Sequence, residues 1–116
     1  MSLAKTTRIA RILDEKIGKD ITILNISNVS SFADYFVLCS AEASTQVKAL
    51  ADEVEYKLDE MGISVSHIEG YRSNSWILLD YVDVIVHIFD KEARDFYDLE
   101  RLWQDGKEVD LTGIID

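Results

Sequence analysis

The sequence of 116 residues contains no proline and only one cysteine, and both scarcities restrict what the chain can be. Cys39 has no partner within the chain for a disulfide, whereas small secreted domains commonly depend on several. A lone cysteine fits a reducing compartment, so we expect a cytoplasmic protein. Because proline is missing, five glycines and short polar segments must provide the helix ends and turns.

Long apolar runs are also missing. No stretch of the sequence approaches the ~20 residues that a membrane-spanning helix needs. The N-terminal segment Met-Ser-Leu-Ala-Lys lacks the apolar stretch of a signal peptide, and residues 1–3 fit a remnant of expression. We therefore expect no membrane contact and a single domain over residues 1–116, a length that suffices for one hydrophobic core.

Positive charge is scarce. The chain has 12 basic and 22 acidic residues, which gives a net charge of −10. Such a chain repels phosphate, so direct binding to nucleic acid is not expected. It attracts basic partners instead, with faster and salt-sensitive association. Acidity can also serve only to keep a small protein in solution, and charge alone favours this simpler interpretation.

The pattern of apolar residues predicts the order helix, strand, strand, helix, three strands, helix. The helices are predicted at residues 9–17 with Gly18 as C-terminal cap, at residues 47–61 after a cap at Ser44 or Thr45, and after a cap at Asp90. The strands are predicted at residues 21–26, 35–40, 63–69, 76–80 and 84–89. This order indicates an α/β (α+β) fold with a mixed sheet of about five strands flanked by helices.

The end of the chain is predicted in two parts. The last helix is expected to contain Phe96, Tyr97, Leu99, Leu102 and Trp103, with Tyr97 and Trp103 packed in the core. Residues 104–116 form a C-terminal tail with scattered apolar residues, and we expect this tail to be ordered only if it docks.

The two strands that form a hairpin before the last helix are the most informative part of the sequence. Both are apolar on both faces, which is typical of a central hairpin covered by helices. A turn at residues 81–82 places Asp80 opposite Asp83, and the same register places Trp76 opposite His87. Tryptophan is enriched at interface hot spots, and binding to a partner and core packing are equally compatible with Trp76.

The sequence offers no complete catalytic or metal-binding group. Cys39 lies within an apolar strand, which favours core packing over a reactive thiolate. In the predicted register, His87 lies roughly 13 Å from the acids at the turn, too far for a shared metal. Asp34 is the best-placed acid for nucleotidyl transfer, but that chemistry needs at least two convergent carboxylates. We therefore assign no catalytic residue, no metal and no cofactor.

Six segments of the chain, in this order, match a known family. They are D-Y-F-V-L-C-S (34–40), Q-V-K-A-L-A-D (46–52), E-G (69–70), W-I-L-L-D-Y (76–81), D-V-I-V-H-I-F (83–89) and R-D-F-Y-D-L-E-R-L-W (94–103). On these segments the chain resembles the Iojap/RsfS family of ribosomal silencing factors. The resemblance covers nearly the whole chain, from about Lys5 to Trp103.

The resemblance implies a nucleotidyltransferase-like fold without known catalysis. It implies binding to a basic ribosomal protein of the large subunit, number fourteen, at the face that meets the small subunit. Occupying that face would sterically block subunit association and lower translation when nutrients are scarce, and the free protein would be a homodimer. Carried over by matching position, the expected partner-binding residues are Glu69, Trp76, Leu78, Leu79 and Asp80.

Two alternatives stay open at this point. One is a residual nucleotidyltransferase centred on Asp34 with Asp80 or Asp83, and the other is a generic homodimeric interaction module. The hairpin also departs from the family, because many relatives carry glycine where this chain has Val82. A valine disfavours the positive φ angles of a tight two-residue turn, so either the turn type differs or the loop is longer.

Overall fold

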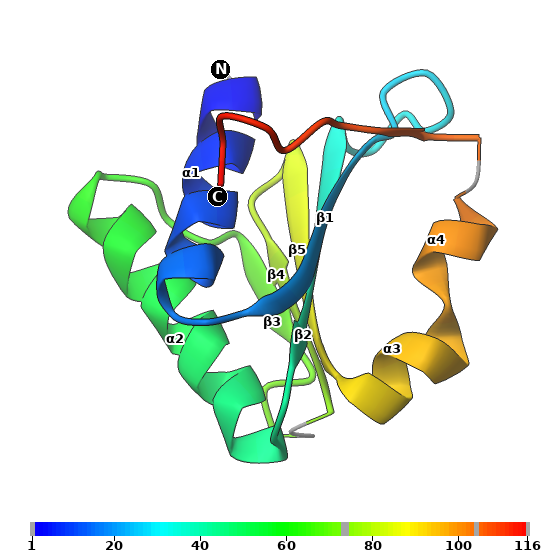
Figure 1. Cartoon of the computed structure of the whole chain (residues 1–116). Coiled ribbons are helices and arrows are strands. Elements are labelled where there is room, and N and C mark those ends of the chain that lie inside the picture. Colours follow the sequence, from blue (N-terminus) through cyan, green and yellow to red (C-terminus); the bar gives the residue numbers. More distant parts are fainter. Residues whose placement is uncertain (1, 73–74, 104, 116) are drawn as a thin grey trace.

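The computed structural model describes residues 2–72, 75–103 and 105–115. Helices and strands are interspersed along the chain (Figure 1). They are α1 (Ser2–Glu15), β1 (Lys19–Asn25), β2 (Tyr35–Ala41), α2 (Ser44–Glu60), β3 (His67–Glu69), β4 (Trp76–Asp80), β5 (Val84–Asp90), α3 (Lys91–Tyr97), α4 (Leu99–Leu102) and β6 (Lys107–Glu108).

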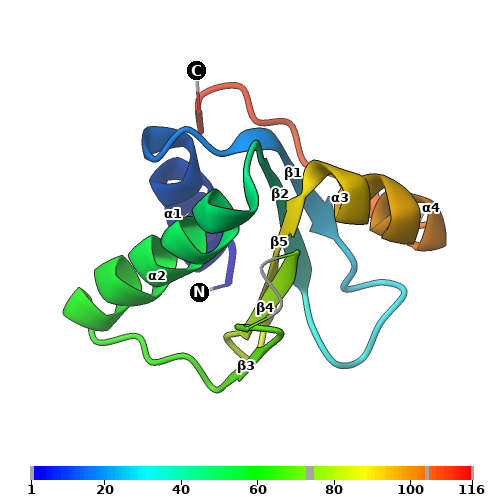
Figure 2. The same ribbon diagram turned by 90° about the horizontal axis from the view of Figure 1, so that it is seen from below.

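The strands form one mixed sheet in the order β3-β4-β5-β2-β1-β6. The central strands β2 and β5 are parallel, and the other neighbouring strands are antiparallel. Helices α1 and α2 cover one face of the sheet, and α3 and α4 lie on the other (Figures 1 and 2). The predicted α/β (α+β) fold is thus confirmed, with six strands where about five were expected.

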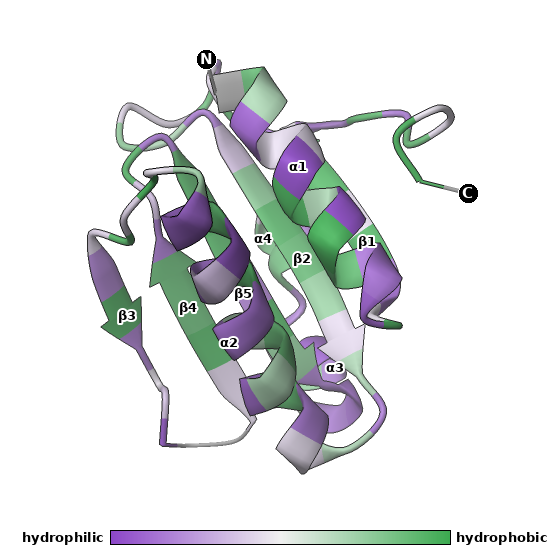
Figure 3. Ribbon diagram, turned by 90° about the vertical axis from the view of Figure 1, so that its left-hand side faces the viewer, coloured by the Kyte–Doolittle hydropathy of each residue, from purple (hydrophilic) through white to green (hydrophobic). Residues whose placement is uncertain are grey.

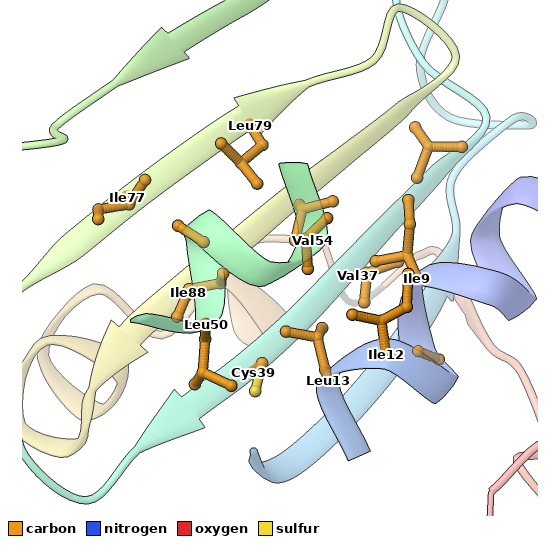
Figure 4. Close-up of a cluster of buried hydrophobic side chains, with 14 of the residues drawn as sticks. Ile9, Ile12, Leu13, Val37, Cys39, Leu50, Val54, Ile77, Leu79 and Ile88 are labelled. Carbon is orange, nitrogen blue, oxygen red and sulfur yellow. The ribbon is translucent and has the colours of Figure 1, made fainter. Parts of the chain in front are cut away.

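The larger part of the core lies between the sheet and the helices α1 and α2. Figure 3 shows strands β2, β4 and β5 to be largely hydrophobic, whereas α2 carries many hydrophilic residues. The apolar side chains of the helices meet those of the strands in one cluster (Figure 4). Its fully buried members include Ile9, Leu13, Val37, Cys39, Val54, Ile77, Leu79 and Ile88. Burial at this depth provides most of the stabilising free energy of a domain of this size.

Cys39 is a core residue, as predicted. Its side chain is fully buried, and burial raises the pKa of the thiol to about 12. The neighbouring turn is adapted to it, because a Cβ atom at Gly18 would lie 2.5 Å from the sulfur of Cys39. The left-handed position after α1 is taken by Ile17, with a φ of 63°, and not by the predicted Gly18. Gly18 is therefore needed for close packing and not for its φ angle.

A smaller apolar cluster lies on the opposite face of the sheet, under α3 and α4. Ala93 and Leu99 from these helices are buried against the strands there. Strand residues in this cluster are Leu24, Phe36, Leu38, Ile85 and Phe89, with Trp76, Leu78 and Trp103 partly buried at its border. Because α3 and α4 are short, they lie beside β1, β2 and β5 and leave the end of this face near β3 less covered (Figure 2).

The hairpin register differs from the prediction by two residues. Asp80 pairs with Ile85 and Trp76 pairs with Phe89, so residues 81–83 form a longer loop. Val82 has a φ of 76°, and its backbone N–H donates to Asp80 Oδ1 at 2.7 Å. This side-chain contact stabilises a wider loop in place of the tight turn that a valine disfavours. A shift of two residues keeps every side chain on its predicted face.

Asp83 is the exception, because it belongs to the loop and not to a strand. It was expected on the face of Trp76, but its carboxylate forms an ion pair with Lys5 Nζ of α1 at 2.6 Å. The backbone N–H of Asp34 also donates to the carbonyl oxygen of Asp83, at 2.8 Å. Asp83 therefore connects the hairpin loop to α1 and to the start of β2.

The predicted last helix is broken in two. Asp90 caps α3 as predicted, by accepting from the backbone N–H of Ala93 at 2.8 Å. Asp98 then takes a left-handed conformation, with a φ of 47°, and separates α3 from α4. The break changes which side chains face the sheet, so that Phe96 is 81% exposed and Leu102 is 72% exposed. The expectation of core packing is also wrong for Tyr97, which is exposed.

Two further boundaries differ. The third strand comprises only His67–Glu69, and the residue before it, Ser66, is a bend whose backbone N–H still donates to the carbonyl oxygen of Asp80 at 2.8 Å. Helix α2 begins at Ser44, one of the two residues expected to cap it, and the cap is Ala43 without a side-chain hydrogen bond. None of the described helices is long and apolar enough to cross a membrane.

The tail docks onto the sheet. Strand β6 pairs with the edge of β1, and the Val109 backbone N–H donates to the carbonyl oxygen of Ile23 at 2.8 Å. Arg11 of α1 donates to the carbonyl oxygen of Ile114 at 3.1 Å. Apolar side chains of the tail then pack at the border of the larger core. Docking explains the sixth strand. Residues 104 and 116, the ends of the predicted tail, lie outside the described residues.

Candidate partner-binding surface

Four of the five residues expected to bind a partner lie on one face of the sheet. Side chains alternate along β4, so Trp76, Leu78 and Asp80 point to the same side, and each is partly exposed. The pairing of β3 with β4 places Glu69 directly opposite Leu78. A shallow pocket of about 180 Å³ is lined by Glu69, Gly70, Trp76 and Leu78. The pairing of these two consecutive strands therefore places the four residues on one side of the sheet.

Leu79 is the exception, and its expected role is corrected. It lies on the opposite side of β4, is completely buried and packs in the core beneath α2 (Figure 4). The cause is the two-residue alternation of a strand, which sends Leu78 and Leu79 to opposite faces. Leu79 supports the sheet from behind and is not available for direct contact with a partner.

Trp76 is held at the border of the smaller core without being sealed in it. Its ring stacks on Phe89, with centroids 5.2 Å apart, and lies 4.5 Å from the ring of Tyr97. The indole Nε1 donates to Nδ1 of His87 at 3.1 Å. These contacts on three sides define the orientation of a tryptophan that stays partly exposed.

The ring contacts extend well beyond Trp76. On α3, Tyr97 contacts Phe96, with centroids 5.1 Å apart. On the other side, His87 contacts the buried Phe36, which contacts Trp103, which in turn contacts Phe32. We call the exposed and partly exposed aromatic members of this network, together with Leu102 beside Phe96 and Tyr97, the aromatic surface. It consists of Phe32, Trp76, Phe96, Tyr97, Leu102 and Trp103.

Sequence reasoning missed five of the six members of the aromatic surface. Phe32 falls between the strands predicted at residues 21–26 and 35–40, and Phe96, Tyr97, Leu102 and Trp103 read as members of one last helix, with Tyr97 and Trp103 in the core. Their helical spacing is the same whether or not the helix breaks, so periodicity gives no warning. The only local signal is Asp98, because aspartate tolerates the left-handed conformation better than most residues.

Acidic side chains border the aromatic surface. Glu69 lies opposite Leu78 and lines a pocket together with Trp76, and Asp80 lies opposite His67 at the other end of β4. At the other end of the aromatic surface, a hollow of about 570 Å³ on α3 and α4 is lined by Asp95, Phe96, Tyr97, Asp98, Arg101 and Leu102. The arrangement of apolar anchors with a mainly acidic border suits a protein surface that is apolar and basic.

His87 lies directly behind Trp76. It is only 4% exposed, and burial lowers the pKa of its imidazole to about 3. The ring is therefore neutral near neutral pH. Because Nδ1 accepts the indole N–H, the proton of the imidazole is on Nε2. Nε2 has no hydrogen-bond partner among the described residues.

Arg94 attaches α3 and α4 to the sheet. Its guanidinium donates to the carbonyl oxygen of Asp20 at 2.6 Å and to Oγ of Ser40 at 2.9 Å. It also donates to Oγ1 of Thr22 at 3.1 Å and to a carboxylate oxygen of Glu100 at 2.8 Å. One side chain thus connects both helices with β1 and β2.

The acids considered for nucleotidyl transfer have structural contacts. The carboxylate of Asp83 is paired with Lys5, and that of Asp80 binds the backbone N–H of Val82. Within residues 2–72, 75–103 and 105–115, no three histidine, cysteine, aspartate or glutamate side chains are placed to hold a metal ion. The geometry of this face offers anchors for a macromolecular partner and not a closed pocket for a small substrate.

Comparison with known proteins identifies the family. A ribosomal silencing factor of Bacillus subtilis is 41% identical over 102 residues, which cover 88% of this chain and 86% of that protein. Its counterpart in Halalkalibacterium halodurans is 39% identical over 103 residues, covering 89% of this chain and 88% of that protein. A crystal structure of a Chromobacterium violaceum protein superposes with a TM-score of 0.84 at 35% identity, covering 95% of this chain and 92% of that one.

The family model described as ribosomal silencing factor during starvation matches residues 1–116. Together with these relatives, the match confirms the resemblance read from the six segments: the chain belongs to the RsfS family of ribosomal silencing factors.

Proposed function

We propose that this protein is a non-enzymatic repressor of translation that binds the large ribosomal subunit through the aromatic surface. The expected target is a basic protein of that subunit, number fourteen, at the face that meets the small subunit. The observation that carries the proposal is the aromatic surface itself, with Glu69 at its border, in a chain that belongs to the RsfS family.

The exposure of these side chains is the physical support. Contiguous exposed apolar side chains with a polar border are typical of binding sites in proteins. Aromatic side chains that are packed on one side and exposed on the other, such as Trp76 and Tyr97, are typical of hot-spot residues. The net charge of −10 supports a basic partner, because complementary charge accelerates association.

Steric exclusion suffices as the mechanism. Two surfaces that bind the same area of the large subunit cannot occupy it together, so the bound protein excludes the small subunit. No chemical step and no conformational change is required. Repression then depends on the affinity for the large subunit and on the concentration of the protein.

Sedimentation of purified subunits tests the proposal. Saturating protein is expected to keep large and small subunits apart, and Trp76→Ala is expected to weaken this effect by at least tenfold, in keeping with a loss of ~2 kcal/mol at a hot spot. Tyr56→Ala is the matched control, because Tyr56 is 61% exposed on α2, on the other side of the sheet. Unchanged joining at saturating protein would contradict the proposal.

The free protein is proposed to be a homodimer, as the family resemblance implies. An exposed apolar surface of this kind favours self-association when its partner is absent. Sedimentation equilibrium over a range of protein concentrations measures this association. A molecular mass of 13.2 kDa at every concentration would show a monomer and remove the dimer from the account.

A further inference from the structure

The inference concerns His87 and rests on the proposed function. His87 is the polar residue in the centre of β5, where its neighbours Val86 and Ile88 are fully buried apolar residues. Its own side chain is only 4% exposed. Its Nδ1 accepts a hydrogen bond from the indole of Trp76 at 3.1 Å. A buried polar side chain in contact with an exposed binding residue is unusual enough to require a cause.

Packing alone does not account for a histidine at this position. Its ring contacts Phe36 and Phe89, with centroids 4.8 and 6.0 Å away. Leucine has a similar volume and would fill the same space without a polar atom. A buried donor such as Nε2, which has no partner in the described part of the chain, carries a desolvation cost that leucine avoids. Histidine at position 87 therefore lowers stability relative to an apolar residue, and this cost must be offset by another role.

The hydrogen bond to Trp76 provides that role. The stacked Phe89 and the adjacent Tyr97 restrict the indole, but aromatic contacts leave it free to tilt and slide. A hydrogen bond from Nε1 fixes the rotation of the ring, because it has a defined direction and length. An anchor that is already oriented loses less conformational freedom when it binds.

We propose that His87 is a positioning residue of the aromatic surface, which holds the Trp76 indole in the orientation that binds the large subunit. The residue acts through Trp76 and does not touch the partner itself, because the indole and the sheet cover it. The proposal assigns a function to the polar interruption of an otherwise apolar strand.

Three variants of the full chain test the proposal by separating stability from affinity. His87→Leu removes Nδ1, which accepts the indole hydrogen bond, together with the buried donor Nε2. His87→Asn keeps an acceptor close to the position of Nδ1, but it leaves a void and a buried amide. Ile85→Val is the matched control, since Ile85 lies on the same strand and face and has no ring contact with Trp76. Urea denaturation measures stability, and titration with isolated large ribosomal subunits measures affinity.

Stability and affinity are expected to change in opposite ways in His87→Leu and in the other two variants. His87→Leu unfolds at a urea concentration equal to or above that of the wild type, yet it binds large subunits about three- to tenfold more weakly, the loss of one hydrogen bond. His87→Asn and Ile85→Val unfold at lower urea concentrations but bind within about twofold of the wild type. The proposal is overturned if affinity follows stability across the series, or if His87→Leu binds as tightly as the wild type.

A second readout keeps the proposal testable if the wild type does not bind large subunits, an outcome that would refute the proposed function. The Trp76 indole N–H resonance in NMR spectra reports the hydrogen bond directly. Its exchange with solvent is expected to be slow in the wild type and in His87→Asn, and at least tenfold faster in His87→Leu. Equal exchange in all three proteins would show that His87 does not position the indole.

Discussion

At the scale of single residues, the surface of this protein depends on side chains that are neither buried nor free. Trp76 is held by a stacked ring, a neighbouring tyrosine and a buried histidine, and it remains partly exposed. This combination orients a large apolar side chain before any partner arrives, which lowers the entropic cost of binding. The same contacts make the surface sensitive to changes behind it, at residues that no partner touches.

The titration of His87 predicts a specific pH dependence of stability. Its pKa is about 3 in the folded protein, well below the ordinary value of 6.5, so folding favours the neutral ring. This contribution is fully present above pH 6.5 and is lost as the pH falls from there toward 3, by at most ~1.4 kcal/mol per pH unit. Urea denaturation of the wild type and of His87→Leu between pH 7 and pH 4 measures it.

The difference between the two proteins is the decisive quantity, because other groups titrate equally in both. The wild type is expected to lose stability relative to His87→Leu steadily below pH 6.5. If the two stability curves stay parallel, the histidine does not titrate as a buried group.

At the scale of elements, the short helices α3 and α4 carry several side chains of the aromatic surface, although few apolar contacts attach these helices to the sheet. Ala93 and Leu99 are their buried residues, whereas Phe96 and Leu102 face solvent. Polar contacts of Arg94 with β1, β2 and α4 must therefore supply part of their attachment. A buried arginine with several partners leaves them unsatisfied when it is removed, which costs more than one exposed ion pair would.

Arg94→Ala is predicted to loosen α3 and α4 selectively. The change leaves the hydroxyl of Ser40 and the carboxylate of Glu100 without their cation, at an expected cost of about 2–4 kcal/mol. Amide hydrogen exchange should accelerate in residues 91–102 and stay unchanged in α1 and α2. Arg101→Ala is the control, because Arg101 is an exposed residue of the same segment, and this change is expected to alter neither the stability nor the exchange in residues 91–102. Uniform acceleration along the chain would mean that Arg94 stabilises the whole fold instead.

The elements also show how far sequence reasoning extends. The strand pattern predicted the two-residue alternation of β4, and with it the shared face of Trp76, Leu78 and Asp80. The same alternation places Leu79 in the core. The family resemblance assigned Leu79 to the binding site only because it lies next to Leu78 in the matching segment. The break at Asp98 could not be predicted, because helical spacing continues through it and one backbone angle decides which side chains are exposed.

The hairpin register could be predicted in part, unlike the alternation of β4, which was predicted, and the break at Asp98, which was not. Val82 indicated that a tight turn was unfavourable, but the sequence did not give the length of the loop that replaces it. The contact of Asp80 with the backbone of Val82 is local, whereas the ion pair of Asp83 with Lys5 and the hydrogen bond from the backbone of Asp34 to Asp83 join the loop to distant segments. Local propensity therefore predicted the strands, whereas tertiary contacts determined their register and the composition of the aromatic surface.

At the scale of the whole molecule, charge and shape act on different steps of binding. A net charge of −10 acts at long range and raises the association rate toward a basic partner. The aromatic surface acts only on contact and slows dissociation. The two contributions are separable, because salt screens the first beyond a Debye length of about 8 Å at physiological ionic strength and leaves the second largely unchanged.

Kinetic measurements are predicted to separate these contributions. Raising the salt concentration should lower the association rate with large subunits and leave the dissociation rate nearly constant. Glu69→Gln should lower the association rate more than Glu60→Gln, which removes the same charge from the exposed end of α2. Trp76→Ala should mainly raise the dissociation rate. A dissociation rate that rises steeply with salt would contradict the dominant role of apolar contacts.

The most direct test of the account is a structure of this protein bound to the large ribosomal subunit. The aromatic surface, with Trp76 at its centre and Glu69 at its border, is expected to lie against a basic ribosomal protein on the face that meets the small subunit. A complex in which Trp76 and Phe96 face solvent while α1 or α2 contacts the subunit would contradict this expectation.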